Sequence, residues 1–212
     1  MEVVKVNSLT EATFLTVLEF ERNKNINLAL TGGNFGEAFI DALVINKVDI
    51  RTWNIFFTDE RLTVKQDDLN GFSLCKKLRD ARNFNYKRIN FFDHKDKKTP
   101  YLDIAFELDK KEIENLNICL LSLGEDGHLA GHFSNSVTMP DSRFCYTDNA
   151  FKPPRKRISF NMKWLKKSDK LILAILGDKK RSALEDLIAG SGMHSDIWNS
   201  KNLLVLTDLD NI

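Results

Sequence analysis

The sharpest chemical signal in this 212-residue chain is a turn with the sequence LGEDGH. Asp126 and His128 follow an apolar run there, two residues apart, so in an extended turn both side chains can project to the same side. A carboxylate beside an imidazole fixes its tautomer and tunes its proton affinity, which suits a general base. His132 could form a metal pair with His128, but no third ligand follows at a supporting spacing. We therefore expect no metal here, and we expect His94 and His194 to be surface histidines.

A second set of residues has the chemistry to hold a phosphate. Gly32 and Gly33 follow an apolar run, and their backbone N–H groups at a helix start would favour an anion. The turn is neither GxGxxG nor a Walker loop, so neither a dinucleotide nor a nucleoside triphosphate is indicated. Lys180 falls in the first turn of another expected helix, and Arg157 precedes a short β-like segment. Since Lys180 belongs to a run of three cations, a solvated basic run is the alternative interpretation.

Three consecutive charged residues, Asp59, Glu60 and Arg61, follow an aromatic-rich run. They cannot all be buried without partners. They therefore form either a solvated turn or the wall of a polar cleft. In a cleft, Arg61 would offer a forked guanidinium to phosphate or carboxylate oxygens. Taken in isolation, the solvated turn is the safer interpretation.

The elements that position these turns follow from hydrophobic patterning. Apolar runs predict strands buried on both faces at residues 3–6, 27–31, 53–58, 118–123, 171–176 and 203–207. Apolar residues three or four apart predict helices at residues 10–20, 36–45, 68–81 and 179–189. Asp68 and Asp178 could cap the last two helices. The alternation predicts a mostly parallel α/β sheet with helices on both faces, and turns that share one pocket at its carboxyl edge.

Composition limits the remaining possibilities. The chain is 42% hydrophobic and 29% charged with a net charge of +1, which argues against a broad nucleic-acid or membrane surface. Three cysteines without a CxxC spacing argue against a disulfide framework, and Cys119 is expected to be a buried free thiol. Neither a signal peptide nor a membrane span is expected, which predicts a cytoplasmic location. The soft segments 94–100 and 134–154 do not separate different halves, so residues 1–212 are expected to form one domain.

Taken in order, these segments resemble the 6-phosphogluconolactonases, within the family of sugar-phosphate isomerases that includes glucosamine-6-phosphate deaminase. The resemblance spans roughly Leu28 to Leu184, and its spacing is far more specific than any single motif. It rests on Gly32-Gly33-Asn34, Asp59-Glu60-Arg61 with Asn70, residues 124–133, Arg157-Ile158-Ser159 and residues 177–180. The chain departs from the family pattern at Asn34, Phe35, Leu69, Gly131 and Ser134.

The resemblance implies a three-layer αβα sandwich around a Rossmann-like sheet, no cofactor, and hydrolysis of 6-phosphogluconolactone to 6-phosphogluconate in the pentose phosphate pathway. By this resemblance His128 is the general base and Asp126 supports it. The implied substrate and phosphate ligands are Gly32, Gly33, Asn34, Asp59, Arg61, Asn70, Arg157 and Lys180. The partner is then a small phosphorylated sugar lactone, with no nucleic acid or membrane, and the protein is a monomer or small homo-oligomer.

Two other functions compete with lactone hydrolysis. Glucosamine-6-phosphate deaminase needs more acid–base groups, and that family has a Glu shortly after its DGH histidine and a Tyr after its Asp-Glu pair. This chain has no carboxylate between His128 and Asp141, and it has Arg61 at the Tyr position. A sugar-phosphate sensor would carry a helix-turn-helix segment, for which the stretch before Asn27 is expected to leave no room. These features favour the lactonase.

Overall fold

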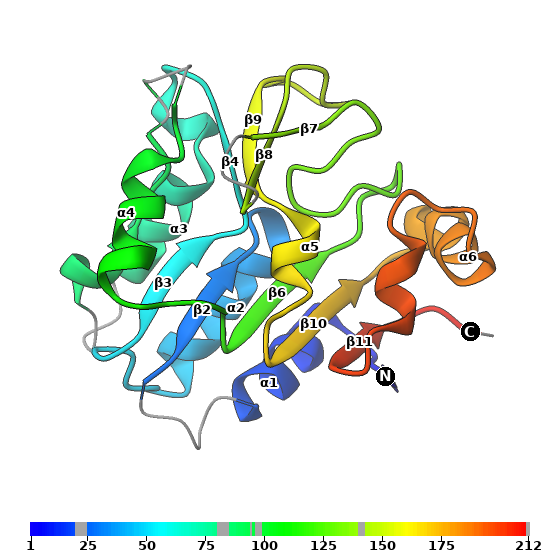
Figure 1. Cartoon of the computed structure of the whole chain (residues 1–212). Helices are drawn as coiled ribbons and strands as arrows, with labels where there is room; N and C mark the ends of the chain where they lie inside the picture. The colour runs from blue at the N-terminus through cyan, green and yellow to red at the C-terminus, as the bar shows by residue number, and fades with distance from the viewer. Residues whose placement is uncertain (20–24, 80–84, 94, 96–98, 140–142, 211–212) are drawn as a thin grey trace.

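A seven-stranded parallel sheet forms the centre of the molecule (Figure 1). The computed structural model describes the chain except residues 20–24, 80–84, 94, 96–98, 140–142 and 211–212. The sheet has the order β1-β11-β10-β6-β2-β3-β5. Its strands are β1 (Glu2–Lys5), β2 (Asn27–Leu30), β3 (Asn54–Phe57), β5 (Ile89–Asn90), β6 (Ile118–Ser122), β10 (Lys170–Ile175) and β11 (Leu203–Thr207). All six predicted strands are present, each within one residue at either end, and β5 was not predicted.

Helices cover both faces of this sheet, which confirms the three-layer αβα architecture. Side chains of β10 alternate between two cores: Leu171 and Leu173 pack into one, and Ile172 and Ala174 into the other. One core contains residues of α1 (Leu9–Leu18), α2 (Gly33–Ile45) and α3 (Asn70–Leu78). The other contains residues of α4 (Leu102–Lys110), α5 (Met162–Leu165) and α6 (Arg181–Ala189). Burial on both faces explains why the strand sequences are continuous apolar runs.

The predicted helix caps at Asp68 and Asp178 are wrong. Asp68 ends a 3-10 turn (Gln66–Asp68), and α3 begins two residues later, where its first N–H groups donate to the carboxylate of Glu60. Asp178 lies in a 3-10 turn (Asp178–Lys180), and α6 begins after it without a side-chain cap. At the start of α3, the first N–H groups of the helix are paired with Glu60, which does not lie next to the helix in the sequence. The residues beside the helix start therefore could not reveal this cap.

A second, antiparallel sheet stands beside the parallel one and was predicted only at its Arg157 segment. It has the order β4-β9-β8-β7, formed by β4 (Asp59–Arg61), β9 (Arg157–Phe160), β8 (Phe144–Thr147) and β7 (Val137–Thr138). Only Thr58 separates β3 from β4, so the chain leaves the large sheet and enters the small one at that residue. The carboxyl edge of β3 therefore carries the charged segment that begins at Asp59.

Two further expectations concern cysteines and membrane segments. Cys75, Cys119 and Cys145 are buried and free, which confirms the expectation for Cys119. Burial raises the pKa of the Cys119 thiol, so this group stays neutral and packs as a small apolar side chain. Over the described residues, we find no helix with the length and apolar character that a membrane crossing requires.

Candidate active site

A cleft of about 630 Å³ opens at the carboxyl edge of the parallel sheet, next to the small sheet. Every site residue expected from the sequence lines it. These residues are Gly32, Gly33, Asn34, Asp59, Arg61, Asn70, Asp126, His128, Arg157 and Lys180. The turns after β2, β3, β6 and β10 thus meet in one pocket, as the parallel topology predicts. The individual roles of these side chains stay predictions.

The turn after β6 presents the imidazole of His128. The carboxylate of Asp126 forms a hydrogen bond with Nδ1 of that ring, and the His128 carbonyl accepts from the Gly124 N–H at 2.9 Å. A Cβ at Gly124 would lie 2.1 Å from Nδ1, so only glycine fits beneath the ring. The ring stacks on Phe133 with a centroid distance of 4.6 Å. The turn and this stacking therefore fix the position of the imidazole.

The hydrogen bond between Asp126 and His128 also decides which nitrogen can act. Partial burial works to raise the pKa of Asp126, but the hydrogen bond and the charge of His128 outweigh it and lower that pKa. Asp126 is therefore a carboxylate that accepts from Nδ1–H. This leaves Nε2 as the nitrogen with a free electron pair. Such a pair can take a proton from water or from a substrate hydroxyl.

A glycine turn and an asparagine meet at the start of α2. Gly32 precedes the helix, and a Cβ at this position would lie 2.2 Å from the amide oxygen of Asn70. The Asn70 amide nitrogen donates to the Asp59 carbonyl at 3.1 Å. Asn34 is exposed in the first turn of α2 and lines the cleft. The first N–H groups of α2 are thus available to an anion in the cleft.

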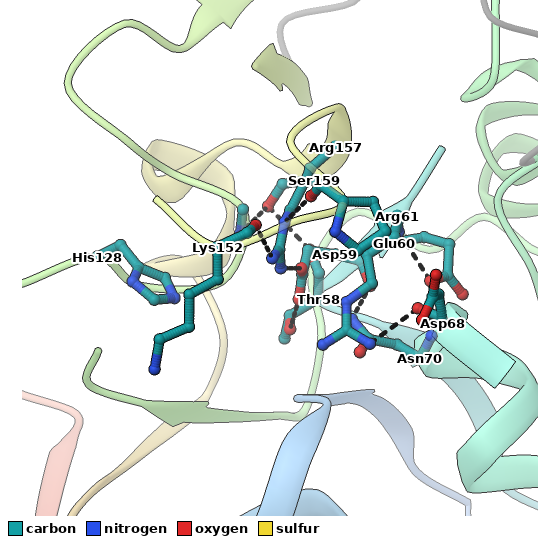
Figure 2. A network of polar contacts seen from close by, with 12 residues as sticks. Thr58, Asp59, Glu60, Arg61, Asp68, Asn70, His128, Lys152, Arg157 and Ser159 are labelled. Carbon is teal, nitrogen blue, oxygen red and sulfur yellow. Dashed lines mark hydrogen bonds and ion pairs between the residues drawn. The ribbon is translucent and has the colours of Figure 1, made fainter. Parts of the chain in front are cut away.

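The charged strand β4 is not the solvated turn that its isolated sequence favoured. Asp59 and Glu60 are buried, and Asp59 and Arg61 line the cleft. The Glu60 carboxylate instead accepts the backbone N–H groups of Arg61, Asn70 and Gly71 at 2.7–2.8 Å. Burial raises the pKa of Glu60 to about 7, and these three hydrogen bonds oppose the shift. Glu60 therefore fastens α3 to β4 and supports the cleft from outside (Figure 2).

The two cations predicted to bind phosphate have different surroundings. Arg157 is buried and donates to the carbonyls of Lys152 and Pro154 at 3.3 and 3.2 Å, and its guanidinium lies 3.5 Å from Asp59 (Figure 2). Lys180 donates to the Ser122 hydroxyl at 3.0 Å, and burial lowers its pKa. Arg157 is therefore largely occupied with the protein, whereas the Lys180 ammonium has donors to spare.

The surface position expected for His194 is wrong, and His94 lies outside the described residues. His194 is buried and meets His132 edge to face at 5.4 Å, because the short helix after it (Ser195–Asn199) packs against α6. Burial lowers the pKa of His194 to about 4. Nε2 of His132 donates to the Phe160 carbonyl at 2.8 Å. Within the part of the chain that the structure describes, no group of His, Cys, Asp and Glu side chains is arranged to hold a metal ion.

Sequence reasoning missed several residues that line the cleft, among them Ser122, Glu125, Phe151 and Lys152. Glu125 stands within the LGEDGH turn, so its place beside Asp126 was a usable signal. Phe151 and Lys152 belong to a proline-containing loop with no periodic pattern, so no signal in the sequence indicated their place in the cleft.

Comparisons with known proteins extend along most of the chain. The family described as glucosamine-6-phosphate isomerases/6-phosphogluconolactonase matches residues 6–198. A 6-phosphogluconolactonase of Borreliella burgdorferi is 25% identical, over 91% of this chain and 87% of that protein. A glucosamine-6-phosphate deaminase of Staphylococcus epidermidis is 22% identical, over 89% and 87%.

Solved structures show the same fold. A 6-phosphogluconolactonase of Thermotoga maritima has a TM-score of 0.79 at 17% identity, over 97% of this chain and 96% of that one. A monomeric glucosamine-6-phosphate deaminase has a TM-score of 0.80 at 16% identity, over 98% and 97%. Fold similarity therefore does not separate the two activities, and the choice between them depends on the site.

Proposed function

Because this chain belongs to the family of glucosamine-6-phosphate isomerases and 6-phosphogluconolactonases, we propose that it hydrolyses 6-phosphogluconolactone to 6-phosphogluconate. The observation that carries this choice is the Asp126–His128 pair, which lines one cleft together with Lys180. One base and one anion site suffice for lactone hydrolysis. The deaminase would need further acid–base groups, whereas this chain has no carboxylate at residues 129–140.

In the proposed reaction, Nε2 of His128 takes a proton from a water molecule as the water oxygen bonds to C1 of the lactone. The carbonyl becomes an oxyanion, and the Asp126 carboxylate stabilises the imidazolium that has formed. The oxyanion then collapses, the bond between C1 and the ring oxygen breaks, and the ring oxygen receives the proton from His128. The products are a hydroxyl group and a carboxylic acid, which releases its proton at neutral pH.

The phosphate of the substrate is proposed to bind at the start of α2, near the N–H groups of Gly32 and Gly33 and the Lys180 ammonium. Asn34, Arg61 and Arg157 also line this cleft and are proposed to complete the polar surroundings of the substrate. Hydrogen bonds to a charged group contribute about 1.5–3 kcal/mol each. A cytoplasmic location and a monomeric or small oligomeric state stay predictions from the sequence.

The test is an assay on freshly generated 6-phosphogluconolactone, with the spontaneous hydrolysis subtracted at each pH and glucosamine 6-phosphate as the second substrate. We expect turnover of the lactone alone, unchanged after dialysis against EDTA. Turnover of glucosamine 6-phosphate without lactone hydrolysis would assign the deaminase activity instead. Loss of lactone hydrolysis on chelation, restored by zinc, would contradict the metal-free mechanism.

A further inference from the structure

Two oppositely charged side chains that the sequence analysis did not single out lie close together in the cleft. Lys152 belongs to the loop before β9, and Glu125 belongs to the turn after β6. The Lys152 ammonium is 3.9 Å from the Glu125 carboxylate, and both residues line the cleft. The side chains are 68% and 48% exposed, so their ion pair is solvated and weak. A ligand with a stronger negative charge can therefore replace Glu125 at the ammonium.

The backbone beneath Lys152 is held in place although its side chain is exposed. Arg157 donates to the carbonyl of Lys152 at 3.3 Å and to that of Pro154 at 3.2 Å. The Arg157 guanidinium also lies 5.8 Å from the ring of Phe133, on which His128 stacks. Figure 2 shows the Lys152 side chain extending from this anchored backbone on the side of His128. The ammonium can thus meet a substrate in the cleft by side-chain rotation alone.

Glu125 acts on the second lysine of the cleft as well. Burial lowers the pKa of Lys180, and the negative charges of Glu125 and Asp208 oppose that shift. One carboxylate therefore lies within the electrostatic reach of both lysines. A phosphate monoester carries up to two negative charges, so two lysines around one carboxylate suit a phosphate better than the carboxylate itself.

We propose that Lys152 is a second lysine ligand of the substrate's phosphate, and that Glu125 is its counter-ion in the free cleft. Glu125 then competes with the phosphate, so this residue sets how tightly the cleft binds a sugar phosphomonoester. The inference rests on the phosphorylated substrate of the proposed function. The two residues should act in opposite directions. Removal of the Lys152 charge weakens binding of the phosphorylated ligand, whereas removal of the Glu125 charge strengthens it.

The experiment is calorimetric titration of Lys152→Met and Glu125→Gln with 6-phosphogluconate, and with glucitol 6-phosphate, which lacks the carboxylate. We expect Kd to rise roughly five-fold in Lys152→Met and to fall roughly two- to five-fold in Glu125→Gln, the range for exposed charge pairs. Both shifts should be equal for the two ligands and should shrink at high salt. Lys156→Met and Glu185→Gln, at exposed positions outside the cleft lining, are the matched controls and should bind like the wild type.

Unchanged or weaker binding by Glu125→Gln would overturn the competition. A loss in Lys152→Met confined to 6-phosphogluconate would assign Lys152 to the carboxylate and would overturn its role at the phosphate. These binding measurements do not depend on turnover. A wild-type protein that binds 6-phosphogluconate without hydrolysing the lactone contradicts the proposed function alone, whereas an active enzyme whose two variants bind normally contradicts this inference alone.

Discussion

The cleft has two walls that use charge in opposite ways. On the wall formed by the parallel sheet, His128 and Lys180 each have one side-chain hydrogen bond to the protein, which leaves capacity for a ligand. On the wall formed by the small sheet, Asp59 and Arg157 are buried and face each other, and Glu60 accepts three backbone N–H groups. We therefore expect the first wall to contact the substrate and the second wall to hold its own shape.

This difference predicts how substitutions divide between function and stability. Charged groups on the parallel-sheet wall can be removed without leaving a buried partner unpaired. On the small-sheet wall Asp59 pairs with Arg157 and Glu60 accepts backbone N–H groups, so the removal of one of these side chains leaves a buried polar group without a partner, which costs free energy. A charge and a position in the cleft therefore do not by themselves identify a residue as a substrate ligand.

The largest effect is expected on the parallel-sheet wall, at His128. His128→Asn removes the proposed base and should lower kcat for 6-phosphogluconolactone by about 10²–10⁴-fold, the usual contribution of a positioned acid or base. Binding of 6-phosphogluconate should survive, because the phosphate contacts come from other turns. Turnover is measured after subtraction of spontaneous hydrolysis. Near wild-type kcat in this variant would move the base to another residue.

Arg157→Met should act first on stability. It leaves the buried Asp59 carboxylate without its cation and frees the carbonyls that hold the loop at residues 152–154. Breaking a buried pair in this way costs about 3–5 kcal/mol in the free energy of unfolding. Urea unfolding measures this loss, and Arg155→Met, at an exposed neighbouring position, is the control. If Arg157→Met were as stable as the control, the small-sheet wall would not depend on this pair.

Lys180→Ala should impair ligand binding rather than stability, in contrast to Arg157→Met. It should weaken 6-phosphogluconate binding by about 1.5–3 kcal/mol, the range for a hydrogen bond to a charged group, and leave the free energy of unfolding nearly unchanged. Titration calorimetry and urea unfolding of the same preparation separate the two quantities. A loss of stability equal to that of Arg157→Met would remove the distinction between the walls.

The smallest effect is a pH dependence at Glu60. Its folded pKa, raised from 4.5 to about 7, means that the folded protein holds this proton more tightly than the unfolded chain. The stabilisation is therefore fully present below pH 4.5 and is lost as pH rises through 7. Relative to Glu60→Gln, wild type should lose about 1–2 kcal/mol of unfolding free energy between pH 5.5 and 7.5. A difference that stays constant over this range would show that Glu60 is ionised throughout.

The sequence predicts the parallel sheet well and the small sheet poorly, for a physical reason. Strands buried on both faces must be apolar along their length, so β6 and β10 are recognisable by composition alone. Strand β4 consists entirely of charged residues and pairs with β9, about a hundred positions away. Its conformation is set by tertiary pairing rather than by its own propensity.

The candidate site likewise contains residues that the sequence predicts and residues that it does not. Turns after buried strands converge because the topology forces them to, so the glycine turns, His128 and Lys180 could be placed from the sequence. Lys152 reaches the cleft through a loop conformation that no local pattern encodes, whereas Glu125 stands beside Asp126 in the LGEDGH turn and could have been placed from the sequence. His194 has polar neighbours in the sequence, and its burial comes from tertiary contacts, with the ring of His132 and through the packing of residues 195–199 against α6.

The most direct test of the difference between the parallel-sheet wall and the small-sheet wall is a crystal structure of the protein with 6-phosphogluconate. We predict phosphate oxygens within about 2.7–3.2 Å of the Lys180 ammonium and of the first backbone N–H groups of α2. The C1 carboxylate should lie beside Nε2 of His128, and Arg157 should keep its contacts with Asp59 and with the carbonyls of Lys152 and Pro154. A phosphate bound at His128, or an Arg157 that leaves Asp59 to become the main phosphate ligand, would contradict the account.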